Sequence, residues 1–202
     1  MRVLITGFGP FPGAPFNPSA ALAKTLARRR RPALAGIERS IHVFATTYAS
    51  VDRDLPKLFA QKQKPDIVLM FGVAGRRRQL CIETRARNAV SLLFPDASGY
   101  RPRHGVIKRR GPAALTGNAP FARLAGAAGT RLSRDAGRYL CNYVYWRALE
   151  HARGTRPLVQ FVHIPPVSSK PRRRRSGKPP TLAQLLKPAE AILIALIAAS
   201  RR

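Results

Sequence analysis

The sequence predicts an α/β fold of three layers, in which helices cover both faces of a mainly parallel, twisted sheet. Apolar strand-like segments alternate along the chain with helical segments, about five of each, which is the pattern of such folds. The run 67–71, Ile-Val-Leu-Met-Phe, is apolar throughout, as expected of a strand covered on both faces. The 202 residues, of which 45% are hydrophobic, are enough for one domain spanning 1–202 with a sizeable core.

The first half of the chain reads as three strands and two helices. A β-branched strand over residues 2–6 enters a loop rich in Gly and Pro. Asn17 as cap and Pro18 at the first helical position predict a helix that continues over 19–30. The later elements are a strand over 37–47, a helix over 50–61 and the strand 67–71, which ends in the loop Gly72-Val-Ala-Gly75. Ligand sites of open α/β sheets lie at such strand ends.

The second half is less regular. Residues 76–94 read as extended structure and residues 95–112 as a basic loop. A flexible basic loop is expected over 168–180, which contains the run Arg172-Arg-Arg-Arg175. The remaining elements are helices over 116–126 and from near Gly137 to His151, a strand over 157–164, and a last helix capped by Thr181 and ending near Ser200.

Cys141 is the candidate nucleophile. Turn-like residues precede it and helix-forming residues follow it, so it is expected in the first turn of its helix. A helix N-terminus has unpaired N–H groups and a partial positive charge. Both favour the thiolate, which is the reactive form of cysteine.

A nucleophilic cysteine needs a base and a group that orients the base. His163 closes the strand 157–164 just before Ile-Pro-Pro, so it is expected at the rim of the sheet; the alternative is a partly buried strand histidine. Glu83 is the best acid among only nine, since it lies among strand-like residues. The alternative for Glu83 is an ion pair with Arg85 or Arg87.

Four separated segments resemble pyroglutamyl peptidase I, the pyrrolidone-carboxylate peptidase family of cysteine peptidases. The family's nucleophile falls on Cys141, its histidine on His163 and its acid on Glu83. The segments are Thr6-Gly-Phe-Gly-Pro-Phe11 with Asn17-Pro-Ser19, Gly72-x-Ala-Gly75 with Ile82-Glu83 and Ala86-x-Asn88, Ser133-x-x-Ala-Gly-x-Tyr-Leu-Cys-Asn142, and Phe161-Val-His-Ile-Pro165.

The resemblance implies a phosphorylase/hydrolase-like fold and an exopeptidase that removes N-terminal pyroglutamyl (5-oxoproline) residues from peptides through a thioester. It implies no metal and no cofactor. The family's pocket-wall positions match Phe8, Phe11, Tyr139 and Leu140, and its polar partner matches Asn17. The loop aromatics could instead close the edge of the core, and Asn17 could be only a helix cap.

The chain departs from the family pattern at two positions. Relatives commonly have Gln where Val73 stands, which is tolerable if that position contacts substrate through its backbone. Relatives often have Arg where Leu93 stands, so any help from that Arg to the oxyanion would be lost. Cys81 is expected to be a small buried filler; the sequence leaves open an oxidative link to Cys141.

The charge is extreme, with 37 Lys and Arg against nine acids and a net +28. An Arg-rich surface explains it most simply, but nonspecific attraction to polyanions is expected, and a nucleic-acid or polyanion binder is the alternative function. Aromatic residues are not interleaved with the Arg runs, which disfavours a single-strand binder.

The two cysteines and the lack of a signal peptide or bilayer-length apolar run indicate a cytoplasmic protein without a membrane partner. The resemblance implies a homo-oligomer, often a tetramer, which the charge would oppose at low salt.

Overall fold

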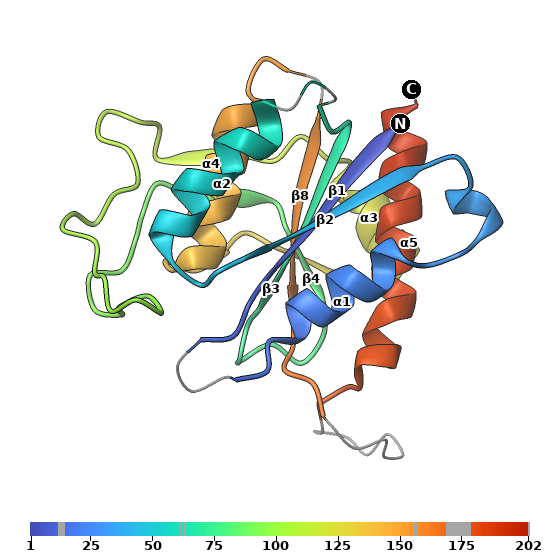
Figure 1. The fold of residues 1–202 in the computed structure, drawn as a ribbon, viewed down its shortest axis with the longest axis horizontal. Coiled ribbons are helices and arrows are strands. Elements are labelled where there is room, and N and C mark those ends of the chain that lie inside the picture. The colour runs from blue at the N-terminus through green and yellow to red at the C-terminus, as the bar shows by residue number, and fades with distance from the viewer. Residues whose placement is uncertain (12–14, 61, 63, 156, 169–178, 202) are drawn as a thin grey trace.

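A six-stranded sheet with helices on both faces forms the frame of the protein, as the computed structural model shows (Figure 1). The structure describes residues 1–11, 15–60, 62, 64–155, 157–168 and 179–201. The sheet has the order β2-β1-β3-β8-β4-β7. Its strands are β1 (Arg2–Phe8), β2 (Glu38–Phe44), β3 (Ile67–Val73), β4 (Cys81–Glu83), β7 (Arg131–Ser133) and β8 (Leu158–Ile164).

The long strands of this sheet are parallel, as predicted. β1 pairs in parallel with β2 and β3, and β3 pairs in parallel with β8. β4 runs antiparallel to β8, and β7 follows β4 in parallel. A separate two-stranded sheet joins β5 (Arg85–Arg87) to β6 (Ala114–Thr116).

The helices divide between the two faces of the sheet and produce two apolar clusters (Figure 1). One face carries α1 (Pro18–Ala27), α3 (Phe121–Ala128) and α5 (Leu182–Ser200), with core residues such as Leu22, Leu124 and Ile192. The other carries α2 (Tyr48–Ala60) and α4 (Leu140–Ala152), with Leu55 and Trp146 in its core. The three-layer prediction is therefore confirmed.

The segment between β3 and α4 differs most from the sequence prediction. Eight strands lie in the described residues, rather than about five, because this segment contributes four three-residue strands that carry too little pattern to be recognised. The helix expected over 116–126 begins at Phe121, since Ala114–Thr116 pairs with β5. The helix of Cys141 begins at Leu140 and not near Gly137, whose φ of 82° is incompatible with a right-handed helix.

The last helix corrects the expectation that the chain has no apolar run of bilayer length. α5 is long and apolar enough to cross a membrane by length and composition alone. Its residues Leu185, Ala189, Ile192 and Leu193 are buried in the cluster formed with the sheet, so it is a core helix of this fold. The predicted cap is confirmed, because Thr181 and Gln184 form a reciprocal capping box.

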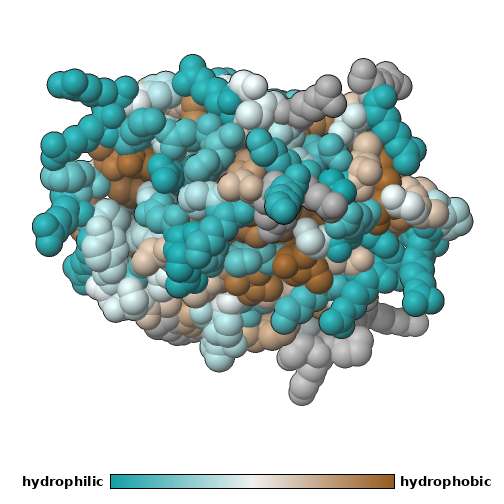
Figure 2. Space-filling model, turned by 45° about the horizontal axis from the view of Figure 1, so that its top comes forward, coloured by the Kyte–Doolittle hydropathy of each residue, from teal (hydrophilic) through white to brown (hydrophobic). Residues whose placement is uncertain are grey.

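Hydrophilic side chains cover most of the face shown in Figure 2, with apolar patches between them. Several of the few acids are already paired with basic residues, as in the bridges of Glu190 to Arg29 and Arg31. The surface is therefore strongly cationic, as the net charge of +28 requires. Most of the predicted basic loop 168–180 lies outside the described residues, and the single domain over 1–202 stays a prediction.

Candidate active site

Cys141 is the second residue of α4 and so lies in the first turn of its helix, as the sequence predicts. The N-cap residue Tyr139 makes no side-chain cap hydrogen bond. The first N–H groups of a helix have no partner within the helix, so those of α4 remain available to a ligand. The half-buried thiol therefore lies at the partially positive end of the helix.

Three neighbouring strands bring the other candidates to the same place. The register pairs Gly72 of β3 with His163 of β8, and His163 with Cys81 of β4. Two residues further along β4 lies Glu83, on the same face as Cys81 because side chains alternate along a strand. The loop-side end of β3 and β8 thus carries the imidazole, as the sequence predicted.

Glu83 and His163 are in direct contact in the interior. Glu83 Oε1 lies 2.8 Å from His163 Nδ1, and the two side chains are 0% and 6% exposed. This contact holds the ring through Nδ1, and the thiol of Cys141 lies near enough to the same imidazole to influence its pKa. The sulfur, the imidazole and the carboxylate therefore form one chain of contacts, drawn from α4, β8 and β4.

The ionisation of His163 reflects these contacts. Burial acts against the imidazolium, but the hydrogen bonds to Cys141 and Glu83, together with their negative charges, outweigh it and raise the pKa of His163 to about 9. The imidazole therefore holds its proton at neutral pH. A protonated imidazole beside the sulfur is the arrangement that activates a cysteine nucleophile.

Gly72 makes room for the sulfur. A Cβ atom at this position would lie 2.7 Å from Cys141 Sγ and 2.7 Å from the ring of Phe161. Real Cβ atoms essentially never approach other atoms that closely, so glycine is required here. The sequence marked the loop that follows this strand, but gave no sign that a side chain of α4 covers its end.

Arg77 is a residue of the site that the sequence did not single out. Its Nη2 lies 3.5 Å from Glu83 Oε1, 2.7 Å from Ser133 Oγ and 3.3 Å from the carbonyl oxygen of Asp135. It thereby links the buried carboxylate to the turn that precedes α4. The run Arg76-Arg-Arg78 offered three equivalent candidates, and only the fold shows which of them reaches Glu83.

Comparison with known proteins agrees with this geometry. The profile of the family described as pyroglutamyl peptidase matches residues 1–202. The pyrrolidone-carboxylate peptidase of Bacillus subtilis is 33% identical over 172 residues, covering 81% of this chain and 78% of that protein. The chain belongs to the pyroglutamyl peptidase family. The comparisons give no support to the alternative of a nucleic-acid or polyanion binder.

Solved structures of this family have the same fold. Pyroglutamyl peptidase I of Bacillus amyloliquefaciens aligns with a TM-score of 0.82 and 26% identity, covering 100% of this chain and 97% of that one. Pyrrolidone carboxyl peptidase of Thermococcus litoralis aligns with a TM-score of 0.83 and 25% identity, covering 99% and 94%. The fold expected from the sequence is therefore that of the pyroglutamyl peptidases.

The apolar residues expected to line the pocket of this pyroglutamyl peptidase differ in exposure. Phe8 and Leu140 are 4% and 1% exposed and belong to the core cluster of α2 and α4. Phe11 is 36% exposed. Tyr139 is half-buried, and its hydroxyl donates to the carbonyl oxygen of Pro95 at 2.8 Å. Among these expected pocket residues, Phe11 and Tyr139 are thus the more accessible ones.

Asn17 and Val73 have structural contacts of their own. Asn17 Oδ1 accepts from the backbone N–H and the hydroxyl of Ser19, and its Nδ2 donates to Gly9, so the amide is used as a helix cap. Val73 packs against the cluster on the α1, α3 and α5 face, opposite to the face of Gly72. A contact of Val73 with substrate would therefore involve its backbone. Leu93, at the second departure from the family pattern, is 74% exposed.

Cys81 is buried and unlinked, as expected of a filler, and burial raises the pKa of its thiol. Among the described residues, no group of three His, Cys, Asp or Glu side chains is arranged to hold a metal ion.

Proposed function

We propose that this protein is a cysteine exopeptidase that removes N-terminal pyroglutamyl residues from peptides. The observation that carries the proposal is the contact chain from Cys141 through His163 to Glu83 in a member of the pyroglutamyl peptidase family. The roles of nucleophile, general acid–base and orienting carboxylate are assigned to these residues in that order.

The mechanism follows from the geometry. The thiolate of Cys141 attacks the pyroglutamyl carbonyl carbon, and the negative charge passes to the carbonyl oxygen. The backbone N–H of Cys141, unpaired at the helix N-terminus, is placed to stabilise that oxygen, a contribution commonly worth about 3 kcal/mol per donor. The C–N bond then breaks as His163 gives its proton to the leaving amine, which leaves a thioester.

The second half of the reaction reverses these roles. A water molecule replaces the departed peptide, and neutral His163 takes its proton as the oxygen attacks the thioester carbonyl. The C–S bond breaks, free 5-oxoproline leaves, and the thiolate and imidazolium are restored. Glu83 holds the imidazole through Nδ1 in both steps and stabilises its positive charge.

The substrate pocket is assigned to the apolar residues around the sulfur. A pyroglutamyl residue has no α-amino charge because its ring is closed, so an apolar, aromatic wall suits it. Phe8, Phe11, Tyr139 and Leu140 are proposed as that wall, and the backbone of Val73 as a polar contact. Asn17 would act through the loop it holds at Gly9.

A fluorogenic assay tests the proposal directly. Purified protein under reducing conditions is expected to release the amine from pyroglutamyl-aminomethylcoumarin, and not from the corresponding prolyl compound, which carries a charged amine. Turnover that is absent, or equal for both compounds, would contradict the proposed specificity.

The pH dependence of activity has a defined sign. The pKa of His163 is raised to about 9, so the imidazolium that protonates the leaving amine is present below pH 9 and lost above it. We expect kcat/KM to fall by roughly tenfold per pH unit above that value. A profile of kcat/KM over pH 6–11, with unfolding monitored in parallel, measures this; an alkaline limb near pH 6.5 would mean that the contacts do not stabilise the imidazolium.

Arg77 is proposed as a positioning residue. Arg77→Gln removes a positive charge from beside Glu83, so we expect kcat/KM to fall by about tenfold and the alkaline limb to move to higher pH, because the imidazolium loses a repulsive neighbour. The exposed neighbour supplies the control, since Arg76→Gln removes the same charge from the same loop. Equal pH profiles of both variants would contradict this role.

Peptides with N-terminal pyroglutamate are the proposed substrates. A reducing cytoplasm is the proposed compartment, since the nucleophile must stay a free thiol.

We also propose self-association through the exposed run Leu92-Leu93-Phe94, whose residues are 48%, 74% and 62% exposed. Sedimentation at low and high salt tests this, because salt screens the net charge of +28. A monomer at all salt concentrations would rule it out.

A further inference from the structure

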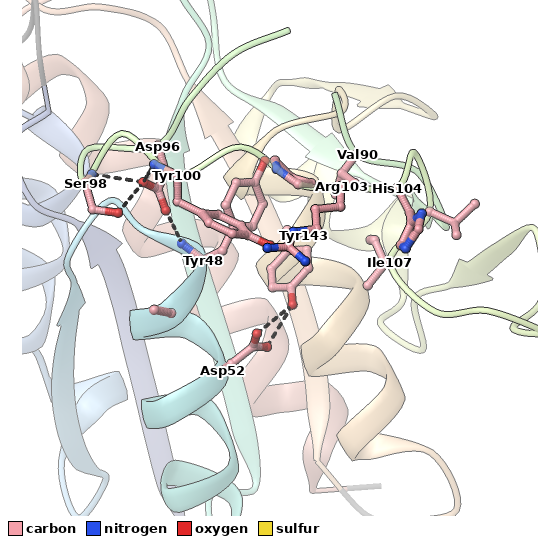
Figure 3. A pocket seen from close by; sticks show the side chains of 13 residues that line it. Tyr48, Asp52, Val90, Asp96, Ser98, Tyr100, Arg103, His104, Ile107 and Tyr143 are labelled. Atoms are coloured by element: carbon pink, nitrogen blue, oxygen red, sulfur yellow. Dashed lines mark hydrogen bonds between the residues drawn. The ribbon is translucent and has the colours of Figure 1, made fainter. Parts of the chain in front are cut away.

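A cavity lies beside the first turn of α4, on the side of that helix that faces α2 (Figure 3). Its volume of about 540 Å³ is in the range of ligand-binding pockets. α2, α4 and the segment 90–107 supply its walls. The residues that determine its chemistry are Tyr48, Asp52, Val90, Tyr100, Ile107 and Tyr143.

Tyr48, which lines this cavity, has a polar group without a partner among the described residues. The residue is 4% exposed, and its hydroxyl oxygen is buried with no hydrogen bond among the described residues. Its ring meets those of Tyr100, Tyr139 and Tyr143 edge to face, with centroids 6.1, 6.1 and 4.9 Å apart. Burial, followed by the charges of Tyr139 and Asp96, raises the pKa of Tyr48, so the hydroxyl keeps its proton and acts as a donor.

Both acids of the cavity are already satisfied, while Arg103 and His104, which also line it, are exposed. Asp96 accepts from the backbone N–H groups of Tyr48, Ser98 and Tyr100, as Figure 3 shows in part. Asp52 accepts from the hydroxyl of Tyr143 at 2.8 Å and lies 3.4 Å from Arg147. These two acids set this cavity apart from the strongly cationic remainder of the surface.

The lining therefore suits a neutral ligand. A free hydroxyl donor matches a peptide carbonyl, and the apolar side chains of Val90, Val106 and Ile107 match an apolar side chain. Peptide is also the class of molecule that the neighbouring thiol is proposed to cleave.

Tyr139 connects the cavity with the active site. It directly precedes Leu140 and Cys141, and its ring lies against that of Tyr48. Its hydroxyl donates to Pro95, next to Asp96 in the cavity wall, and Ser91 N–H donates to the carbonyl oxygen of Arg138. The wall of the cavity is thus attached to the residues that position the nucleophile. An extended peptide advances about 3.3 Å per residue, so a few residues suffice to pass from one side of Tyr139 to the other.

We propose that this cavity is a subsite for the leaving part of the substrate, which takes an apolar side chain located two or three residues after the scissile bond, while Tyr48 donates to a peptide carbonyl. This inference rests on the proposed function. It assigns to the protein a preference beyond the pyroglutamyl residue itself.

A peptide series tests the inference. The substrates are pyroglutamyl-aminomethylcoumarin, which is too short to reach the cavity, and the amides of pyroglutamyl-Ala, pyroglutamyl-Ala-Leu and pyroglutamyl-Ala-Ala-Leu, each Leu peptide with an Asp counterpart. We expect kcat/KM for one Leu peptide to exceed that for its Asp counterpart by about tenfold or more. The ratio of kcat/KM for that peptide to kcat/KM for the coumarin compound reports on the cavity alone.

Two variants and a matched control complete the test. Tyr48→Phe is expected to lower that ratio by roughly fivefold, the effect of one lost hydrogen bond, with no loss of thermal stability because the removed hydroxyl has no partner in the fold. Val106→Asp places a charge at the rim and is expected to lower the ratio by at least about tenfold. Leu132→Asp is the control, since Leu132 and Val106 are 47% and 45% exposed and Leu132 does not line the cavity.

The outcomes separate the two proposals. If the coumarin compound is not cleaved, the proposed function fails. If it is cleaved, but Leu and Asp peptides react equally, or Tyr48→Phe and Val106→Asp keep the wild-type ratio, the subsite is wrong and the proposed function stands.

Discussion

Cys141→Ala is expected to abolish pyroglutamyl hydrolysis, lowering kcat by a factor of about 10⁴ or more while the fold remains intact. Without the sulfur no thioester can form, and the imidazolium of His163 has no group to activate. The residue is half-buried at the start of α4 and the substitution favours the helix, so the melting temperature should change by only a few degrees. A fluorogenic assay and thermal unfolding of the same preparation measure both quantities.

The chain supplies a matched control in its only other cysteine. Cys81 lies opposite His163 in the strand register but is buried beneath the site, so Cys81→Ala is expected to keep most of the activity. Iodoacetamide should inactivate the wild type and Cys81→Ala at similar rates. If activity survived in Cys141→Ala but not in Cys81→Ala, the assignment of Cys141 as the nucleophile would be wrong.

Gly72→Ala is expected to have the second largest effect, a loss of about 10²-fold or more in kcat/KM together with about 1–3 kcal/mol in the free energy of unfolding. The new Cβ would meet Cys141 Sγ and the Phe161 ring at 2.7 Å each, so either the sulfur or the ring must move. Displacement of the sulfur by even 1 Å from the imidazole is costly in rate. Steady-state kinetics and denaturant unfolding measure the two losses.

Gly75→Ala is the control for this prediction. It adds the same methyl group three residues further along the loop, where nothing lies within 4 Å of a new Cβ. We expect near wild-type activity and stability for this variant. If Gly72→Ala were as active as Gly75→Ala, the sulfur would not lie over the end of β3 during the reaction.

Local patterns were sufficient for the long elements and for singling out the three residues that are proposed to react. The apolar run of β3, the Asn17 cap with Pro18, and the Thr181 cap each act over a few neighbouring residues, and the structure has those elements where the sequence predicts them. Cys141 was recognisable because it stands at the start of a clear helical pattern. His163 was recognisable because it stands at the end of a clear strand pattern. Glu83 was recognisable because acids are rare in this chain, with only nine present.

The sequence by itself therefore determined the α/β layers, the family resemblance and the chemical types available for catalysis, since these depend on residue identity and on short-range periodicity. Only the tertiary structure decided that Gly72 makes room for the sulfur, that Arg77 rather than its neighbours reaches Glu83, and that Tyr48, with an unpartnered hydroxyl among the described residues, lines a cavity beside Tyr139. The short strands β4 and β7 also became visible only there. The physical reason is the same for all of them, because each depends on contacts between residues far apart in the chain, and such contacts leave no pattern in the residues nearby.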